Sequence, residues 1–120
     1  MALTDFGKAI RKARIDTGET LGSMADAVGV TPSFLSSIET GRKKVPEGLV
    51  TQVAAFFARH GVKIKQLPEL AAVANKSVPL DGLSPQHQML VAGFARSSLD
   101  AETLEKMAAL LAASHKVKSK

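Results

Sequence analysis

The chain has 120 residues and a formal net charge of +5; 45% of its residues are hydrophobic, only 4% are aromatic and none is cysteine. This length suits one domain, or one compact domain plus an assembly element. The lack of cysteine excludes disulfide scaffolds, thiolate nucleophiles and Cys-based zinc sites, and the scarcity of aromatic residues favours closely packed helices over a β-sandwich.

No stretch approaches the roughly 20 apolar residues of a membrane span, and an N-terminus that reaches Asp5 so soon does not resemble a signal peptide. We therefore expect a soluble, cytoplasmic protein. The three histidines are scattered at His60, His87 and His115, and no Gly-rich phosphate loop or paired-carboxylate motif accompanies them. These features argue against an enzyme, and we expect no metal and no cofactor.

The basic residues are concentrated in the first half of the chain. Residues 1–65 hold ten Lys and Arg against six Asp and Glu, whereas residues 81–114 hold two against four. This asymmetry suits a polyanion at one end and a neutral-to-acidic assembly surface at the other. A charge of +5 is also ordinary for a small soluble domain, so charge alone does not establish DNA binding.

The first predicted helix covers residues 4–17, with Thr4 as its cap and Phe6, Ile10 and Ala13 on one face. Gly18 closes it.

Residues 20–41 then predict two short helices around a tight turn. Thr20 caps the first of them, and Gly29 ends it. The apolar face of this helix follows the spacing i, i+3, i+4, i+7 and consists of Leu21, Met24, Ala25 and Val28.

The second of the two helices covers residues 32–40. Thr31 offers a hydroxyl cap, and Pro32 takes the first helical position, where its missing N–H costs nothing. Leu35 and Ile38 face inward, and Gly41 ends the helix. Two helices joined by a turn of this kind predict a helix-turn-helix.

This stretch resembles the helix-turn-helix of the Cro and lambdoid-repressor family of regulators, also called XRE-like. The resemblance covers about the first half of the chain. It rests on the positions where the family requires small, turn, core and capping residues: Ala25, Gly29, Val30, Leu35, Ile38, Glu39 and Gly41. It implies a five-helix DNA-binding module in which Arg14 and Glu39 form a buried ion pair between the first and third helices. The alternative is that both are solvated surface charges.

Beyond this motif, residues 46–59 predict a fourth helix, and a fifth starts at Pro68 and stops at Asn75. Residues 76–80 are expected to be extended, with an alternation that would permit a short edge strand. The residues expected to face inward in these two helices are Leu49, Val53, Phe56, Phe57, Leu70, Ala71, Val73 and Ala74.

The C-terminal part predicts two more helices, one opened by Ser84 and Pro85 and a last one over residues 101–113. The expected fold is therefore all-α, a five-helix helix-turn-helix module followed by a two-helix extension. In domain terms, residues 1–75 form the DNA-binding domain, residues 76–114 a helical dimerisation extension, and residues 115–120 a flexible basic tail.

The apolar side chains of the extension must be buried somewhere. They either pack back on the N-terminal module as ordinary core or form a self-association surface. We favour self-association, because repressors of the type that the chain resembles usually need two copies of the motif. The expected dimer contacts are Val78, Leu80, Met89, Leu90, Phe94, Leu104, Met107 and Leu111.

In a family member, helix 32–40 would enter the major groove of DNA with its outward residues. The candidates for contact with bases are Pro32, Ser33, Phe34, Ser36 and Ser37. Ser33 and Ser37 match the family's base-reading positions. Phe34 either presses on a thymine methyl or is partly buried against the preceding helix. No Arg, Asn or Gln lies on this helix, so Arg42 and Lys43, or DNA shape, must supplement its specificity.

Phosphate contacts are expected at the N-terminus of the preceding helix and in the basic loop after helix 32–40. These candidates are Thr20, Leu21, Gly22, Thr31, Arg42, Lys43 and Lys44. Many relatives carry a glutamine at the position of Leu21, so the backbone-anchoring hydrogen bond of that side chain is absent here.

The sequence thus predicts a transcriptional regulator that binds double-stranded DNA as a homodimer, in the manner of a repressor on a palindromic operator. The alternative is an antitoxin that neutralises a protein partner and autoregulates its operon. The short tail, about six residues of Lys, Ser and Val with His115, argues mildly for the repressor, because it offers no toxin-wrapping extension.

Overall fold

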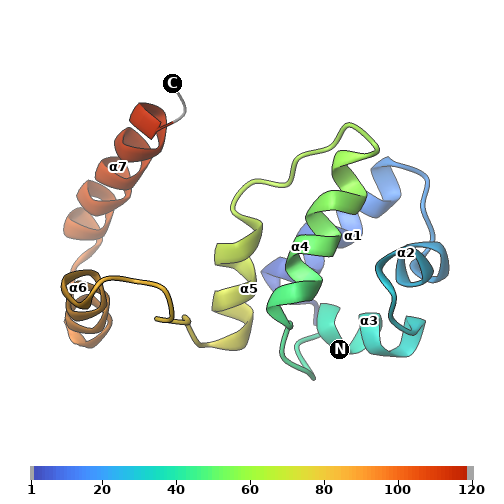
Figure 1. Ribbon diagram of the computed structural model, residues 1–120, viewed down its shortest axis with the longest axis horizontal. Coiled ribbons are helices and arrows are strands. Elements are labelled where there is room, and N and C mark those ends of the chain that lie inside the picture. Colours follow the sequence, from blue (N-terminus) through green and yellow to red (C-terminus); the bar gives the residue numbers. More distant parts are fainter. Residues whose placement is uncertain (1, 119–120) are drawn as a thin grey trace. The chain divides into compact units, whose positions relative to one another are not determined.

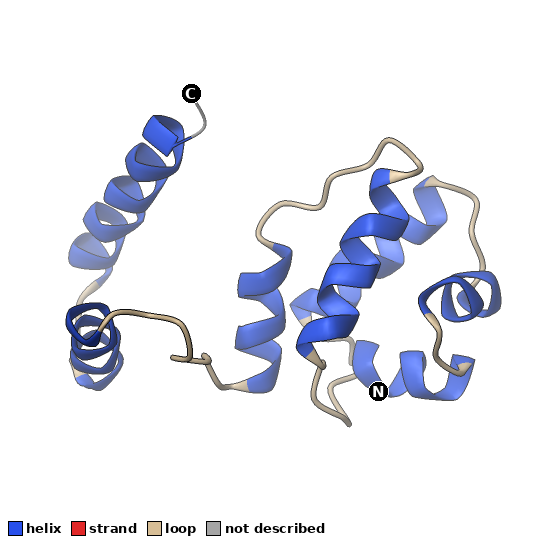
Figure 2. Cartoon of the chain, viewed as in Figure 1, coloured by secondary structure: helices blue, strands red, loops and turns tan. Residues whose placement is uncertain are grey.

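A computed structural model describes the backbone of residues 2–118 and the side chains of residues 2–114. These residues form helices and loops without a strand (Figure 2), so the prediction of an all-α fold is confirmed. The chain divides into two compact units, one that runs to Pro79 and one that begins at Leu80. Residues 76–79 therefore belong to the first unit.

The first unit contains five helices, which Figure 1 labels in chain order. Their bounds are α1 Asp5–Asp16, α2 Leu21–Val28, α3 Pro32–Glu39, α4 Glu47–Ala58 and α5 Leu67–Asn75. Helix α1 packs against α3 and α5, α2 packs against α3 and α4, and α4 packs against α5. One apolar core joins all five helices.

Threonine side chains begin the first three helices, as the sequence predicts. The side-chain oxygens of Thr4, Thr20 and Thr31 each accept a hydrogen bond from a backbone N–H three residues further on. Replacing such a cap by alanine typically costs about 1 kcal/mol. The donors are Gly7, Ser23 and Phe34, at distances of 3.0, 2.9 and 3.0 Å.

The core consists of large apolar side chains from every helix of the first unit. Each buried side chain of this size contributes about 1.5–3 kcal/mol relative to an exposed one. The fully buried members with the largest volumes are Phe6, Phe57, Ile10, Met24, Leu35, Ile38 and Val53.

The inward face of α5 differs in part from the prediction. Val73, expected inside, is 69% exposed, whereas Leu67 and Ala71 are buried. Leu70 and Ala74 pack against the core half-buried. The helix begins at Leu67, and a stripe that starts there and repeats every three to four residues leaves Val73 on the opposite face.

The chain after α5 forms no edge strand in the part that the structure describes. Lys76 ends the helix in the left-handed conformation, with φ at 55°, so the prediction of an extended backbone is wrong at this residue. Residues 77–80 follow as a loop. Val78 in this loop is exposed.

The second unit contains α6, Pro85–Arg96, and α7, Ala101–Lys118. Ser84 and Asp100 cap them through hydrogen bonds from His87 N and Thr103 N, at 3.1 and 2.8 Å. Helix α7 continues past the predicted end at residue 113 and through part of the predicted flexible tail, because no glycine or proline interrupts the sequence there. Residues 119 and 120 lie outside the described residues.

The second unit has no interior of its own among the described side chains. No residue from 85 to 114 is buried, and α6 and α7 expose a series of large apolar side chains. These are Met89, Leu90, Phe94, Leu104, Met107, Leu110 and Leu111. Among the described helices, none combines the length and the apolarity that a membrane crossing requires.

Candidate nucleic-acid interface

Helices α2 and α3 form the predicted helix-turn-helix, which Figure 1 shows at one end of the first unit. Gly29 caps α2 in the left-handed conformation, with φ at 79°. Val30 N then donates to Ala25 O at 2.9 Å, and the Val30 side chain packs half-buried against the core. The turn thereby directs Leu35 and Ile38 into the core, where both are fully buried, and it leaves the opposite face of α3 outside.

The predicted base-contacting residues lie on this outer face and on its margin. Pro32 and Ser33 are exposed, whereas Phe34, Ser36 and Ser37 are half-buried. Ser37 Oγ donates to Ser33 O at 3.0 Å, so its proton is engaged within the helix. Towards a base edge, the Ser37 hydroxyl therefore offers lone pairs as a hydrogen-bond acceptor.

Phe34 is held between the core and a cation. Its ring packs against the core from the protein side. The Nζ of Lys43 lies over the ring, 5.5 Å from its centroid. Lys43 comes from the loop after α3, so the structure brings together two predicted DNA-contacting residues that the sequence treats separately.

The N-terminus of α2 is the second predicted contact. Thr20 and Gly22 are exposed there, and Leu21 is half-buried. A capping box uses two backbone donors, because Ser23 N donates to Thr20 Oγ1 and Thr20 N donates to Ser23 Oγ, both at 2.9 Å. The remaining N–H groups of the first turn belong to Leu21 and Gly22, the donors that a phosphate at a helix N-terminus would take.

A carboxylate adjoins this helix terminus, and sequence reasoning missed it. Glu19 Oε1 accepts from Ser23 Oγ at 2.8 Å, and Glu19 Oε2 lies 3.2 Å from Nε2 of His60, which follows α4. The hydrogen bond from Ser23, and then the contact with His60, hold the pKa of Glu19 below its ordinary value. His60 is 41 positions away in sequence, so no local pattern could have indicated the contact.

The basic loop between α3 and α4 carries the remaining predicted phosphate contacts. Arg42, Lys43 and Lys44 are all exposed. The loop leaves α3 through Gly41, whose φ is 76°, and Arg42 N donates to Ser37 O at 2.9 Å. These bonds fix the start of the loop on the last turn of α3. Thr31, the other predicted contact, is exposed at the opposite end of that helix.

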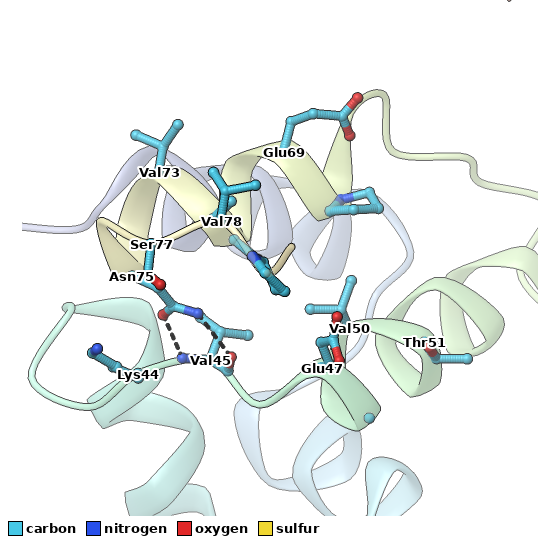
Figure 3. A pocket seen from close by; sticks show the side chains of 15 residues that line it. Lys44, Val45, Glu47, Val50, Thr51, Glu69, Val73, Asn75, Ser77 and Val78 are labelled. Carbon is cyan, nitrogen blue, oxygen red and sulfur yellow. Dashed lines mark hydrogen bonds between the residues drawn. The ribbon is translucent and has the colours of Figure 1, made fainter. Parts of the chain in front are cut away.

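Asn75 fixes the far end of the basic loop. Its Nδ2 donates to Val45 O at 2.9 Å and its Oδ1 accepts from Val45 N at 2.7 Å, as the dashed lines in Figure 3 mark. The sequence predicts only a helix stop at Asn75. The only local signal was an amide side chain at the end of a helix, and it does not identify the partner.

Arg14 and Glu39 come together in an ion pair between α1 and the end of α3. The bond joins Arg14 Nη1 to Glu39 Oε2, and the two side chains are only 9% and 6% exposed. The backbone carbonyl of Glu39 also accepts from Thr4 N at 3.0 Å. These contacts fix the C-terminal end of α3 on α1, and with it the orientation of the outer face.

A groove lies beside the anchored loop within the first unit. It has a volume of about 740 Å³ and is lined mainly by apolar atoms of the α4 N-terminus, α5 and residues 77–79. Figure 3 shows Val50, Val73 and Val78 around it. The sequence indicates no such groove.

The predicted dimer contacts are distributed over both units. Val78 and Leu80 lie on the connecting segment, the first exposed and the second half-buried. The remaining contacts project from α6 and α7 and are all exposed: Met89, Leu90, Phe94, Leu104, Met107 and Leu111.

Comparisons with known proteins identify the family. The family described as "Helix-turn-helix domain" matches residues 5–67, which is just over half of the 120 residues. The crystal structure of the clp gene regulator ClgR from Corynebacterium glutamicum is 29% identical in sequence, with 78% of this chain and 85% of that chain covered and a TM-score of 0.47. No curated protein matches. The chain belongs to the XRE-like helix-turn-helix family of DNA-binding transcriptional regulators.

Proposed function

We propose that the protein is a dimeric repressor that binds a palindromic operator with α3 in the major groove. One observation supports the DNA-binding part of this proposal: α3 exposes Pro32 and Ser33, and the loop after it carries three exposed cations, Arg42, Lys43 and Lys44, of which Lys43 lies over the ring of Phe34 on α3. Base contacts in a groove need phosphate contacts on either side of it, since the phosphate contacts set the register of the helix.

The base contacts and the phosphate contacts fall to different residues. Ser33 and Ser37 face the base edges, while Arg42, Lys44 and the N–H groups of Leu21 and Gly22 bind phosphates. Thr31 and Thr20 border the same surface. Each lost phosphate contact lowers the slope of log K against log salt by about 0.9.

The second unit supplies most of the dimer contacts. The large apolar side chains on α6 and α7 are exposed, and no side chain described between residues 85 and 114 is buried. Burying them between two copies would stabilise a dimer by about 25 cal/mol for each Å² of apolar surface removed from water. A two-fold dimer places its two α3 helices about 34 Å apart, which corresponds to half-sites roughly 10 bp apart. Occupancy of such a site represses by excluding other proteins from it.

The test combines light scattering of the pure protein with selection from a random DNA pool at two salt concentrations. We expect a dimer, an enriched palindrome, and an affinity that falls as salt rises. Arg42→Gln should lower the affinity for every sequence, whereas the matched change Arg96→Gln, on the exposed surface of α6, should leave it unchanged. A pool without any enriched sequence would refute sequence-specific binding.

The lack of an interior in the second unit also favours one other function. An antitoxin would cover the same apolar side chains with a protein partner rather than with a second copy. A monomer in light scattering, together with a small protein that co-purifies in equal amounts and is released by Leu104→Asp but not by Glu105→Gln, would favour the antitoxin over the repressor.

A further inference from the structure

The outer face of α3 lacks the side chains that usually distinguish one base from another. Its sequence, Pro-Ser-Phe-Leu-Ser-Ser-Ile-Glu, holds no Arg, Lys, Asn or Gln. Serine accepts or donates single hydrogen bonds and therefore discriminates weakly between the four bases. A bidentate or cationic donor, in contrast, recognises the O6 and N7 of guanine. A guanine-reading donor for this face must come from outside the helix.

Lys43 is the cation that returns to this face. Its backbone N–H donates to Ser37 O at 3.3 Å, next to the shorter bond from Arg42 N, so the loop turns back over the last turn of α3. From there the side chain extends to Phe34, where Nζ lies 5.5 Å from the ring centroid. Phe34 and Ser37 are three residues apart and therefore neighbours on the helix surface.

Phe34 can hold the ammonium in place because its own position is fixed. The ring packs half-buried against the core, and the electron-rich face of an aromatic ring attracts a cation. A lysine that reaches a phosphate usually moves freely on its flexible stem. At Lys43 the ring restricts that freedom and keeps the charge over Phe34 on α3.

We propose that Lys43 reads a guanine in each half-site, with Phe34 as the positioning residue that holds its ammonium group over the base-reading face of α3. This inference rests on the proposed DNA-binding function. It replaces the thymine-methyl contact considered for Phe34, and it separates Lys43 from Arg42 and Lys44, which remain phosphate contacts.

The experiment compares selected DNA motifs and affinities for the wild-type protein, Lys43→Met and Lys44→Met. The wild type should enrich one guanine in each half-site. Lys43→Met should lose a preference of roughly five- to hundredfold for that guanine while the other positions of the motif are retained. Lys44→Met, the matched control, should weaken all sequences alike and lower the salt slope by about 0.9.

Two changes at Phe34 test the positioning role. Phe34→Leu keeps an apolar side chain against the core but removes the aromatic face, so it should lower the guanine preference by about two- to fivefold, which is the contribution of an exposed cation–π contact. Phe34→Tyr keeps the aromatic face and should retain the preference. Thermal unfolding of each variant checks that the first unit is folded.

The outcomes separate this inference from the function on which it rests. A wild-type protein that selects no sequence would overturn both. A selected palindrome that Lys43→Met weakens uniformly would leave the repressor proposal standing and overturn the assignment of Lys43. A guanine preference that is unchanged in Phe34→Leu would overturn the positioning role of Phe34.

Discussion

Both polar atoms of the Asn75 side-chain amide bond to the backbone of one residue, Val45. Nδ2 donates to the Val45 carbonyl at 2.9 Å, and Oδ1 accepts from the Val45 N–H at 2.7 Å. The pairing imitates one rung of a β-ladder between the last residue of α5 and the residue that follows the basic loop. It makes the position of Arg42 and Lys44 depend on α5.

Asn75→Ala should therefore act on stability and on DNA binding together. The Val45 N–H and carbonyl would lose their partners, which costs about 1–3 kcal/mol for buried groups, and the basic loop would lose its anchor. Urea unfolding and a DNA-binding titration measure the two effects. Gln52→Ala, an exposed change on α4, is the control. Equal stability of Asn75→Ala and the wild type would contradict the anchoring role.

The Arg14–Glu39 pair predicts a strongly non-additive double mutant. Either Arg14→Met or Glu39→Leu alone leaves one charge buried without its partner and should cost about 3–5 kcal/mol. The double variant removes both charges and should recover most of that loss. Urea unfolding of all four proteins gives the coupling energy.

The exposed pair Lys12–Asp16 on the same helix serves as the control, since its side chains are 78% and 55% exposed. Lys12→Met should change the free energy of unfolding by no more than about 1 kcal/mol. If the double variant at Arg14 and Glu39 is as unstable as the sum of its single changes, the two side chains do not act as a pair.

Gly7 is predicted to tolerate no side chain. A Cβ at this position would stand 2.1 Å from Glu39 O, the same carbonyl that accepts from Thr4 N. Gly7→Ala must push α1 away from α3, and overpacking of this kind costs about 1–3 kcal/mol or more. A Cβ at Gly48, in α4, meets nothing within 4 Å. Gly48→Ala should therefore stabilise the protein by up to about 1 kcal/mol, and thermal unfolding distinguishes the two. An unchanged midpoint for Gly7→Ala would show that α1 and α3 are further apart.

Local signals in the sequence account for most of the helix boundaries, because caps and stops act within one turn. Thr4, Thr20 and Thr31 cap the helices that the sequence assigns to them. The prediction of which α5 residues face inward is partly wrong. The inward stripe starts at Leu67, one residue before Pro68, which the sequence indicates as the start of the helix. The end of α7 was set too early, since alanine-rich sequence without a breaker gives no stop signal.

A contact in the candidate site could be predicted where the family resemblance named both partners. It could not be predicted where neither a motif nor a local pattern in the sequence pointed to the partner. Arg14 and Glu39 belong to the first kind. The contacts of Asn75 with Val45, of Lys43 with Phe34 and of Glu19 with His60 belong to the second kind. Each of these depends on how loops lie on the packed helices, and side-chain periodicity carries no information on that.

The lowered pKa of Glu19 predicts how the free energy of unfolding depends on pH in acid. Its pKa is lowered from the ordinary value of 4.5, first by the hydrogen bond from Ser23 and then by His60, while partial burial acts in the opposite direction. The unfolded chain therefore binds a proton at Glu19 at a pH where the folded chain does not, so the stabilisation is present above pH 4.5 and is lost as pH falls through the folded pKa.

Glu19→Gln keeps an oxygen that accepts from Ser23 but removes the charge. It should be less stable than the wild type at neutral pH, and the difference in free energy of unfolding should vanish once Glu19 is protonated in the folded protein. NMR titration of the Glu19 carboxyl should show its pKa rising towards 4.5 more in Ser23→Ala than in His60→Asn, because the hydrogen bond from Ser23 is the larger cause. A stability difference that persists in acid would mean that the substituted amide perturbs the end of α1 or the cap of α2 by its shape, and that the charge of Glu19 does not stabilise the folded state.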